Sequence, residues 1–157
     1  MTDNSDLYEA DFLLWTERQA AALRRAKGAN LPLDWDNLAE EIESLGRSQR
    51  RELSSQLRRV LRHLLKLQAS PAAEPRAGWG ATIREARKEI DNLLRDSPSL
   101  RRQVQSLIDD EAGLAAELAV ADLSRYGEPV GAVRARLSQG GFTAEQVLGD
   151  WFPDTPG

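Results

Sequence analysis

The apolar residues of this chain recur with the period of an α-helix almost from end to end. Residues 35–68 are the clearest case, because this long segment contains no proline and a single glycine, Gly46. At 100° per residue, five of its apolar side chains fall within about 80° of one another on a helical wheel: Leu53, Leu57, Val60, Leu64 and Leu67. The alternating β-branched and aromatic runs that predict strands are missing. The sequence therefore predicts an all-α fold.

Start and stop signals divide the chain into elements. We expect a bundle of four main helices, over residues 7–25, 35–68, 79–95 and 98–126, then short helices at 130–137 and 144–148. Ser97 followed by Pro98 is typical of a helix start, and Thr143 with Gln146 has the form of a capping box. Since only Asp96 and Ser97 separate the third and fourth helices, these two are expected to be antiparallel. The length of 157 residues fits one helical domain over residues 1–157.

The apolar side of the second helix changes direction near Gly46. Leu38, Ile42 and Leu45 lie some tens of degrees away from the apolar residues that follow Gly46. This rotation indicates a bend or short break at Gly46, or one helix that changes packing partners along its length.

Two residue types restrict the chemistry. The chain has no cysteine, which excludes disulfides, thiolate zinc sites and a cysteine nucleophile. His63 is the single histidine, so a metal site would rest mainly on carboxylates, and we expect neither a metal nor a cofactor. No apolar segment is long enough to span a membrane, and the acidic N-terminus lacks a signal-peptide pattern, so we expect a cytoplasmic protein without a membrane partner.

Charge is unevenly distributed along the chain. Residues 1–45 carry 4 basic and 10 acidic side chains, residues 46–68 carry 7 and 1, and residues 103–157 carry 3 and 9. Five cations of the second helix share one side, which we call the basic stripe: Arg47, Arg51, Arg58, Arg62 and Lys66. It could bind phosphates, but it has no interleaved aromatic residues and its flanks are acidic, which argues against nucleic acid. A solvated or internally paired surface is the simpler interpretation.

Three charged residues stand where the helical period predicts core. Arg87 lies in the middle of the apolar side of the third helix, and Glu111 and Asp122 lie within that of the fourth. A buried guanidinium needs an anionic partner, so we predict that Arg87 pairs with Glu41 or Glu111. Such a pair either fixes helix packing or forms a site that holds an anion.

His63 lies at the edge of the apolar side of the second helix, close to Lys66. A lone histidine in that position is typically a hydrogen-bonded boundary residue. Glu41 lies on the same side, but 22 residues of unbroken helix would put it about 33 Å away. The candidate polar cluster thus comprises Glu41, His63, Lys66, Arg87 and Glu111, with no catalytic role assigned.

The order of several short motifs is similar to that of a known family. They are Asp11-Phe12 with Trp15, Asp34-Trp35 with Asn37-Leu38, Glu40-Glu41-Ile42, His63-Leu64-Leu65-Lys66, Trp79 with Ile83, Arg87 and Ile90, Ser97-Pro98-Ser99-Leu100, and Trp151-Phe152-Pro153. Over about residues 7–153 the chain resembles the bacterial domain of unknown function 29. The resemblance implies an all-helical fold and brings no assigned function.

Three functions therefore stay open. The first is a non-enzymatic helical module, interacting with another protein or regulatory, or forming a homodimer through its second helix. Antiparallel self-pairing of that helix would set its acidic segment against its basic one. The second is an enzyme or small-anion-binding protein with a site around Arg87, His63, Lys66 and a carboxylate. The third is nucleic-acid binding by residues 47–66.

Overall fold

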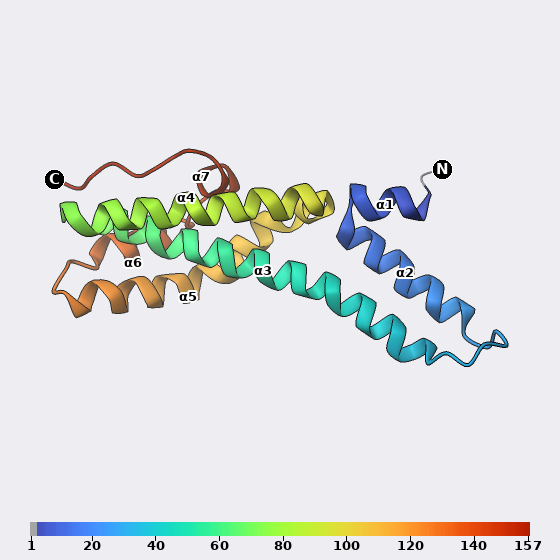
Figure 1. Ribbon diagram of the computed structural model, residues 1–157. Helices are drawn as coiled ribbons and strands as arrows, with labels where there is room; N and C mark the ends of the chain where they lie inside the picture. Colours follow the sequence, from blue (N-terminus) through green and yellow to red (C-terminus); the bar gives the residue numbers. More distant parts are fainter. Residues whose placement is uncertain (1–2) are drawn as a thin grey trace. The chain divides into compact units, whose positions relative to one another are not determined.

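The computed structural model describes residues 3–157, and every regular element in that range is a helix (Figure 1). The predicted all-α class is confirmed. The elements in chain order are α1 (Asn4–Ala10), α2 (Phe12–Ala26), α3 (Trp35–Ala69), α4 (Ala73–Asp96), the 3-10 helix η1 (Pro98–Gln103), α5 (Val104–Arg125), α6 (Gly131–Ser138) and α7 (Ala144–Leu148).

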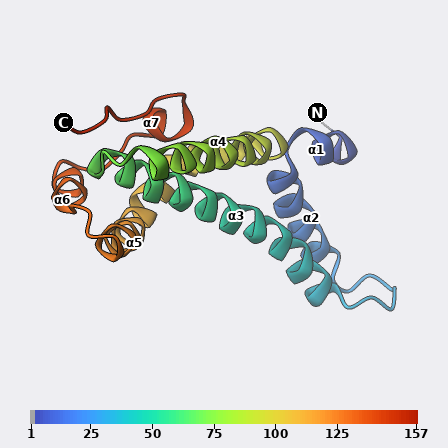
Figure 2. The ribbon, with the colours of Figure 1, turned by 60° about the vertical axis from the view of Figure 1, so that its left-hand side comes forward.

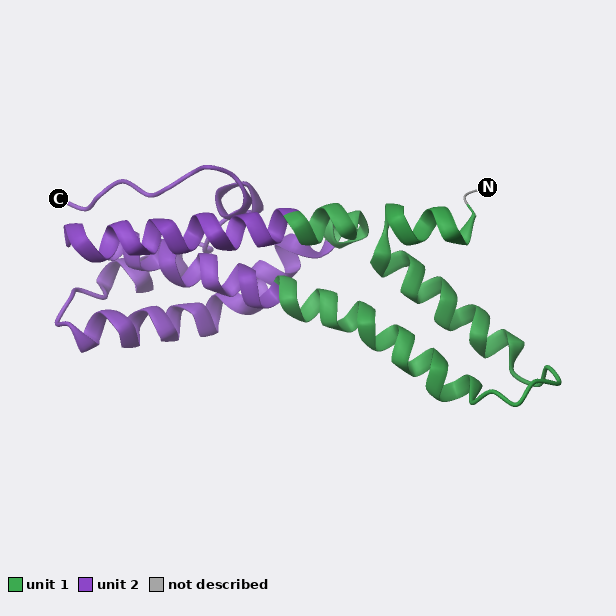
Figure 3. Ribbon diagram, in the orientation of Figure 1, with its two compact units in different colours: residues 1–53, 92–102 green, residues 54–91, 103–157 purple. Residues whose placement is uncertain are grey.

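The chain divides into two compact units (Figure 3). Unit 1 contains residues 1–53 and 92–102, and unit 2 contains residues 54–91 and 103–157. Helix α3 contributes its first half to unit 1 and its second half to unit 2. The expectation of a single domain over residues 1–157 stays a prediction.

In unit 2 the second half of α3 lies beside α4 (Figures 1 and 2). Pairs such as Arg59 with Glu85 and Lys66 with Trp79 make these helices antiparallel, whereas Arg58 with Glu111 and Arg62 with Asp122 make α3 and α5 parallel. Helix α4 is therefore antiparallel to α5, as predicted. The apolar side predicted after Gly46 is buried, with Leu57, Val60 and Leu64 at 0% exposure.

Small residues form much of the buried side of α5. Ala115 and Ala119 are 0% exposed, whereas Leu114 is 44% exposed. Alanine brings little apolar area of its own but lets a neighbouring helix approach closely. The packed side of α5 is therefore formed largely by alanines, and Leu114 does not belong to it.

In unit 1, α2 and the first half of α3 form a helical hairpin. Ala39 and Leu53 are buried, but Leu38 and Leu45 are 39% and 48% exposed. The apolar residues before Gly46 thus do not form a second buried side. The apolar residues change direction on the helical wheel because the surroundings of α3 change along its length. The helix itself continues through Gly46 without a break.

The predicted first helix is divided at Asp11, which corrects the expected continuous helix over residues 7–25. Asp11 has an extended backbone with φ −157°, and its carboxylate accepts the N–H of Leu14, so it caps α2. The same carboxylate accepts the backbone N–H of Ser99 at 2.7 Å and the Ser99 hydroxyl at 2.9 Å. Because these hydrogen bonds join Asp11 to a residue far away in the sequence, they stabilise a break with a helix cap at Asp11 rather than a continuous helix.

Two other boundaries differ from expectation. Helix α4 begins at Ala73 rather than at Trp79, because Pro75 falls in its first turn, where no intrahelical N–H bond is needed. The predicted fourth helix begins as η1, and Ser97 does not cap it with its side chain. The Ser97 hydroxyl instead accepts the N–H of Leu13 and donates to Gln49.

The short C-terminal helices agree with the sequence. Helix α7 begins and ends at the predicted residues, and Thr143 and Gln146 form the predicted capping box. Helix α6 covers nearly the same residues as the predicted turn of helix at 130–137.

Helices α2 and α3 approach each other closely at Gly46. A Cβ atom at this position would lie 2.6 Å from Thr16 Oγ1 and 2.9 Å from Leu13 Cδ1. Thr16 is itself fully buried, and its hydroxyl donates to the carbonyl of Leu13 at 2.6 Å, so it has little freedom to move. Gly46 is therefore required by packing and not by a kink.

We expect Gly46→Ala to lower the free energy of unfolding by about 1–3 kcal/mol through overpacking. Gly113→Ala is the matched control, because Gly113 is also helical but has no neighbour within 4 Å of the added Cβ. It should raise stability by about 0.5–1 kcal/mol. Urea unfolding followed by circular dichroism measures both, and equal effects of the two substitutions would contradict the close approach.

Candidate functional site

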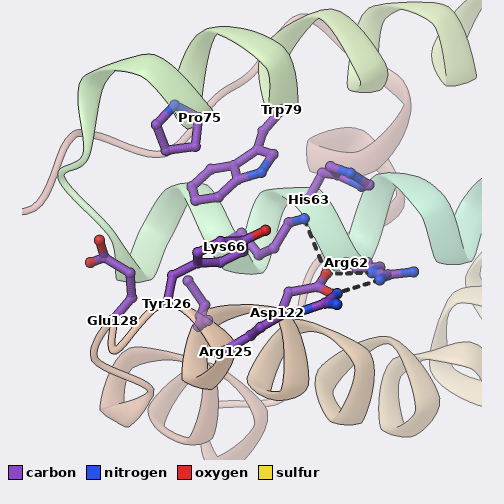
Figure 4. Close-up of a pocket in the computed structure, with 10 residues that line it drawn as sticks. Arg62, His63, Lys66, Pro75, Trp79, Asp122, Arg125, Tyr126 and Glu128 are labelled. Atoms are coloured by element: carbon purple, nitrogen blue, oxygen red, sulfur yellow. Dashed lines mark hydrogen bonds and ion pairs between the residues drawn. The ribbon is translucent and has the colours of Figure 1, made fainter.

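A cavity of about 700 Å³ opens in unit 2 between α3, α4 and the end of α5 (Figure 4). This volume is in the range of small-molecule sites. The side chains that line it are Arg62, His63, Lys66, Pro75, Trp79, Asp122, Leu123, Arg125, Tyr126 and Glu128.

Helical spacing explains how these residues meet. His63 and Lys66 are three apart on α3 and share one side of it, as do Pro75 and Trp79, four apart on α4. Asp122 and Tyr126 are likewise four apart at the end of α5, and Tyr126 terminates that helix. Each of the three helices therefore contributes one row of side chains to the cavity wall.

Asp122 is the centre of the polar part of the cavity. Its two oxygens accept from Arg62 Nε and Arg62 Nη2, both at 2.7 Å, and one of them also accepts from Lys66 Nζ at 3.1 Å (Figure 4). The hydrogen bonds from Arg62, helped by the one from Lys66, lower the pKa of the Asp122 carboxyl to about 2. Asp122 is therefore a carboxylate at neutral pH and binds two cations at once.

Lys66 is a buried ammonium group. The residue is 6% exposed, and its Nζ atom lies 5.0 Å from the centroid of the Trp79 ring. Burial lowers the pKa of this ammonium below its ordinary value, although the hydrogen bond to Asp122 acts in the opposite direction. Of the three lysines in the chain, Lys66 is buried, while Lys27 and Lys88 are exposed.

His63 is neutral at physiological pH. Burial, with a smaller effect from Lys66 and neighbouring arginines, lowers the pKa of the ring to about 4. Its Nδ1 lies 2.8 Å from the carbonyl oxygen of Arg59, so Nδ1 carries the proton and donates it to that carbonyl. The lone pair on Nε2 then has no hydrogen-bond donor among residues 3–157.

Positive charge exceeds negative charge in this cavity. Arg62, Lys66 and Arg125 are cationic, against the carboxylates Asp122 and Glu128. In the hydrogen-bonded part the ratio is two cations to one carboxylate. The cavity thus suits a ligand with negative charge or with an acceptor oxygen.

The structure brings together only part of the candidate cluster predicted from the sequence. His63 and Lys66 line the same cavity, whereas Glu111 pairs with Arg58 at 2.9 Å, outside its lining. Glu41 is an exposed residue of unit 1. The central carboxylate, Asp122, was noticed as a charge on an apolar helix side but not assigned to the cluster. Nothing in the sequence except its residue type indicated that Trp79 lines this cavity.

The predicted partner of Arg87 is wrong. Its guanidinium donates to three backbone carbonyls: from Nε to Val147 at 2.9 Å, and from Nη2 to Gln146 at 2.8 Å and Trp151 at 2.7 Å. Two of these carbonyls belong to the last turn of α7. Carbonyls at this end of a helix have no hydrogen-bond donor within the helix, and their dipoles favour a nearby cation. Backbone acceptors thus replace the carboxylate that the sequence argument required.

The basic stripe is largely neutralised within the chain. Arg47 pairs with Glu40, Arg58 with Glu111, and both Arg62 and Lys66 with Asp122. Arg51 donates to the Ser48 hydroxyl. Few of these charges are left to attract phosphates.

No cluster of three or more potential metal-ligating side chains occurs between residues 3 and 157. None of the helices in the described part of the chain combines the length and the apolar character needed to cross a membrane.

Comparisons with known proteins agree with the helical fold. The family model described as "Domain of unknown function DUF29" matches residues 7–152. An α-helical protein of unknown function from Rhodospirillum rubrum has a crystal structure similar to this one, with 26% sequence identity and a TM-score of 0.75. The similarity covers 92% of this chain and 90% of that one. No curated protein matches the chain.

We expect Arg87→Met to lower the free energy of unfolding by about 2–4 kcal/mol, because three carbonyls lose a charged donor. Lys88→Met, at the exposed neighbouring position, is the control and should change stability by less than about 0.5 kcal/mol. Urea unfolding gives both values, and limited proteolysis should cut residues 144–153 faster in Arg87→Met alone. Equal stability of the two variants would contradict a structural role for Arg87.

Proposed function

The chain belongs to the family of the domain of unknown function DUF29, and we propose that unit 2 is a binding module for a small organic anion with a flat apolar part. The sequence predicted a non-enzymatic interaction or regulatory module, with a small-anion site as the alternative. The proposal joins the two: Asp122 is the carboxylate of the site, and Arg62 takes the place that the sequence gave to Arg87. We further propose a bacterial origin, since the matched structure comes from a bacterium, and we keep the cytoplasmic location expected from the sequence.

One observation carries this proposal, namely that Arg62 and Lys66 share a single carboxylate at the wall of a cavity. A buried charge without full compensation costs free energy, and a bound anion would remove that cost. We expect Lys66 to contact the bound anion, because Arg62 already uses two of its nitrogens on Asp122, whereas Lys66 makes one hydrogen bond to Asp122. An ammonium group has three donors, so two of them are left for a ligand.

The rest of the wall favours an apolar, flat body. The Trp79 ring, Pro75 and Leu123 line the cavity together with Tyr126, which is 78% exposed at the end of α5. Aromatic rings bind flat molecules by stacking and by edge contacts. An aromatic carboxylate combines both requirements, with its ring against Trp79 and its carboxylate near Lys66.

The test compares indole-3-carboxylate with indole-3-carboxamide, which has the same shape and no charge. We expect the carboxylate to bind, measured by isothermal titration calorimetry, and the amide to bind at least about tenfold more weakly, as a lost charged hydrogen bond implies. Lys66→Met should weaken carboxylate binding by a similar factor, and Lys88→Met should not. Equal affinities for the two compounds would contradict the proposal, as would tight binding by Lys66→Met.

A separate observation in unit 1 favours the homodimer as a second candidate function. Apolar side chains are exposed along the start of α3 and the loop before it: Leu31 by 59%, Leu33 by 47%, Leu38 by 39% and Leu45 by 48%. A second copy of the chain that buried these four side chains would remove apolar area from water, which favours association.

Sedimentation equilibrium over a range of concentrations tests the dimer. We expect Leu38→Gln combined with Leu45→Gln to weaken association about tenfold or more, because burial of two leucines is lost. Salt should have little effect, since the basic stripe is mostly paired within the chain, whereas charge-driven self-pairing of α3 would weaken in salt. A monomer at every concentration would contradict this second candidate.

A further inference from the structure

We infer that Lys66 is a reactive amine that condenses reversibly with an aromatic aldehyde seated in the unit 2 cavity. The inference deepens the proposed function, because it rests on the same cavity and names a second class of compound for it. It does not require the aldehyde to carry a negative charge.

The position of the amine is the first argument. The Lys66 side chain is 8% exposed, yet the residue lines a cavity of about 700 Å³. Figure 4 places its amine between the Trp79 ring and the Asp122 carboxylate. A molecule that reaches this nitrogen therefore has to enter the cavity, where its flat part meets Trp79.

Charge balance is the second argument. Two cations share Asp122, and a bound anion is one way to balance them. The other way is the loss of one proton from a cation, and an arginine side chain does not lose its proton in proteins. Arg62 occupies both oxygens of Asp122 at 2.7 Å, so that pair is neutral by itself. Lys66 is the group that can become a free amine, and its burial favours this form.

His63 is the third argument. It lines the same cavity three residues before Lys66, and its Nδ1–H is held by the carbonyl of Arg59. The remaining lone pair on Nε2 is available to accept a hydrogen bond from a ligand group that reaches it. The cavity thus holds an amine, which is the nucleophile of imine formation, and a proton acceptor. Its aromatic wall binds the flat part of the aldehyde.

The reaction balances without an oxidant or reductant. Lys66 gives up one proton, and its nitrogen lone pair forms a bond to the carbonyl carbon as the π bond of the carbonyl breaks. A second proton moves from the nitrogen to the oxygen, which gives a carbinolamine with a hydroxyl group. The first proton returns to the hydroxyl group, which leaves as water, and the product is a protonated imine. The product carries one positive charge, as the ammonium did, and Asp122 compensates it at the same place.

The test uses 2-naphthaldehyde, a neutral flat aldehyde, with sodium cyanoborohydride added at pH 7 to reduce any imine to a stable amine. The three lysines of the chain give an internal control, since Lys27 and Lys88 are exposed. We expect peptide mapping by mass spectrometry to find Lys66 labelled several-fold faster than Lys88, because the cavity holds the aldehyde at this amine and burial favours the free amine. The labelling rate of Lys66 relative to that of Lys88 should fall as the pH rises, because the exposed lysines then lose their protons too.

Lys66→Arg keeps the charge and should lose the fast label while labelling of Lys88 continues unchanged. Labelling of Lys66 at or below the rate of Lys88, in folded protein, would overturn the inference. Indole-3-carboxylate separates it from the proposed function. If the carboxylate binds and Lys66 is not labelled, the inference fails and the proposed function stands. If Lys66 is labelled and the carboxylate neither binds nor slows labelling, the inference stands and the proposed function fails.

Discussion

The unbroken helix α3 provides buried side chains to both compact units, and most other elements are arranged to cover them. Its second half buries Leu57, Val60 and Leu64 within unit 2, while its first half contacts α2 at Gly46 in unit 1. A helix of 35 residues has to satisfy two different environments along its length. The position of Gly46 and the change in apolar direction both follow from that constraint.

Three charged residues that lie on apolar sides of helices are compensated in three different ways. Arg87 donates to carbonyls at the end of α7, Glu111 pairs with Arg58, and Asp122 binds two cations. In the first, neutral carbonyl dipoles compensate the guanidinium, and in the second, two opposite charges form a pair. The third has an excess cation and an adjoining cavity. This combination, rather than burial of charge alone, distinguishes a candidate site from a structural ion pair.

The same excess charge connects the two chemical proposals for unit 2. A bound anion balances Arg62 and Lys66 while both keep their protons, whereas the reaction inferred for Lys66 begins with the loss of its proton. Which form prevails depends on what occupies the cavity, because desolvation by a ligand without charge favours the free amine. A neutral His63 is compatible with both forms, since it adds no further positive charge to the cavity.

The sequence by itself determined the helical class, the buried side of α3 after Gly46 and the capping box at Thr143. Each of these depends on residues within a turn or two of one another, so the local pattern contains the full information. Tertiary structure decided the partner of Arg87, the union of Lys66 with Asp122 and the exposure of Leu38 and Leu45. These outcomes depend on which distant segment packs against a helix. A backbone carbonyl, the acceptor that Arg87 uses, is present in every residue type and leaves no mark in a sequence.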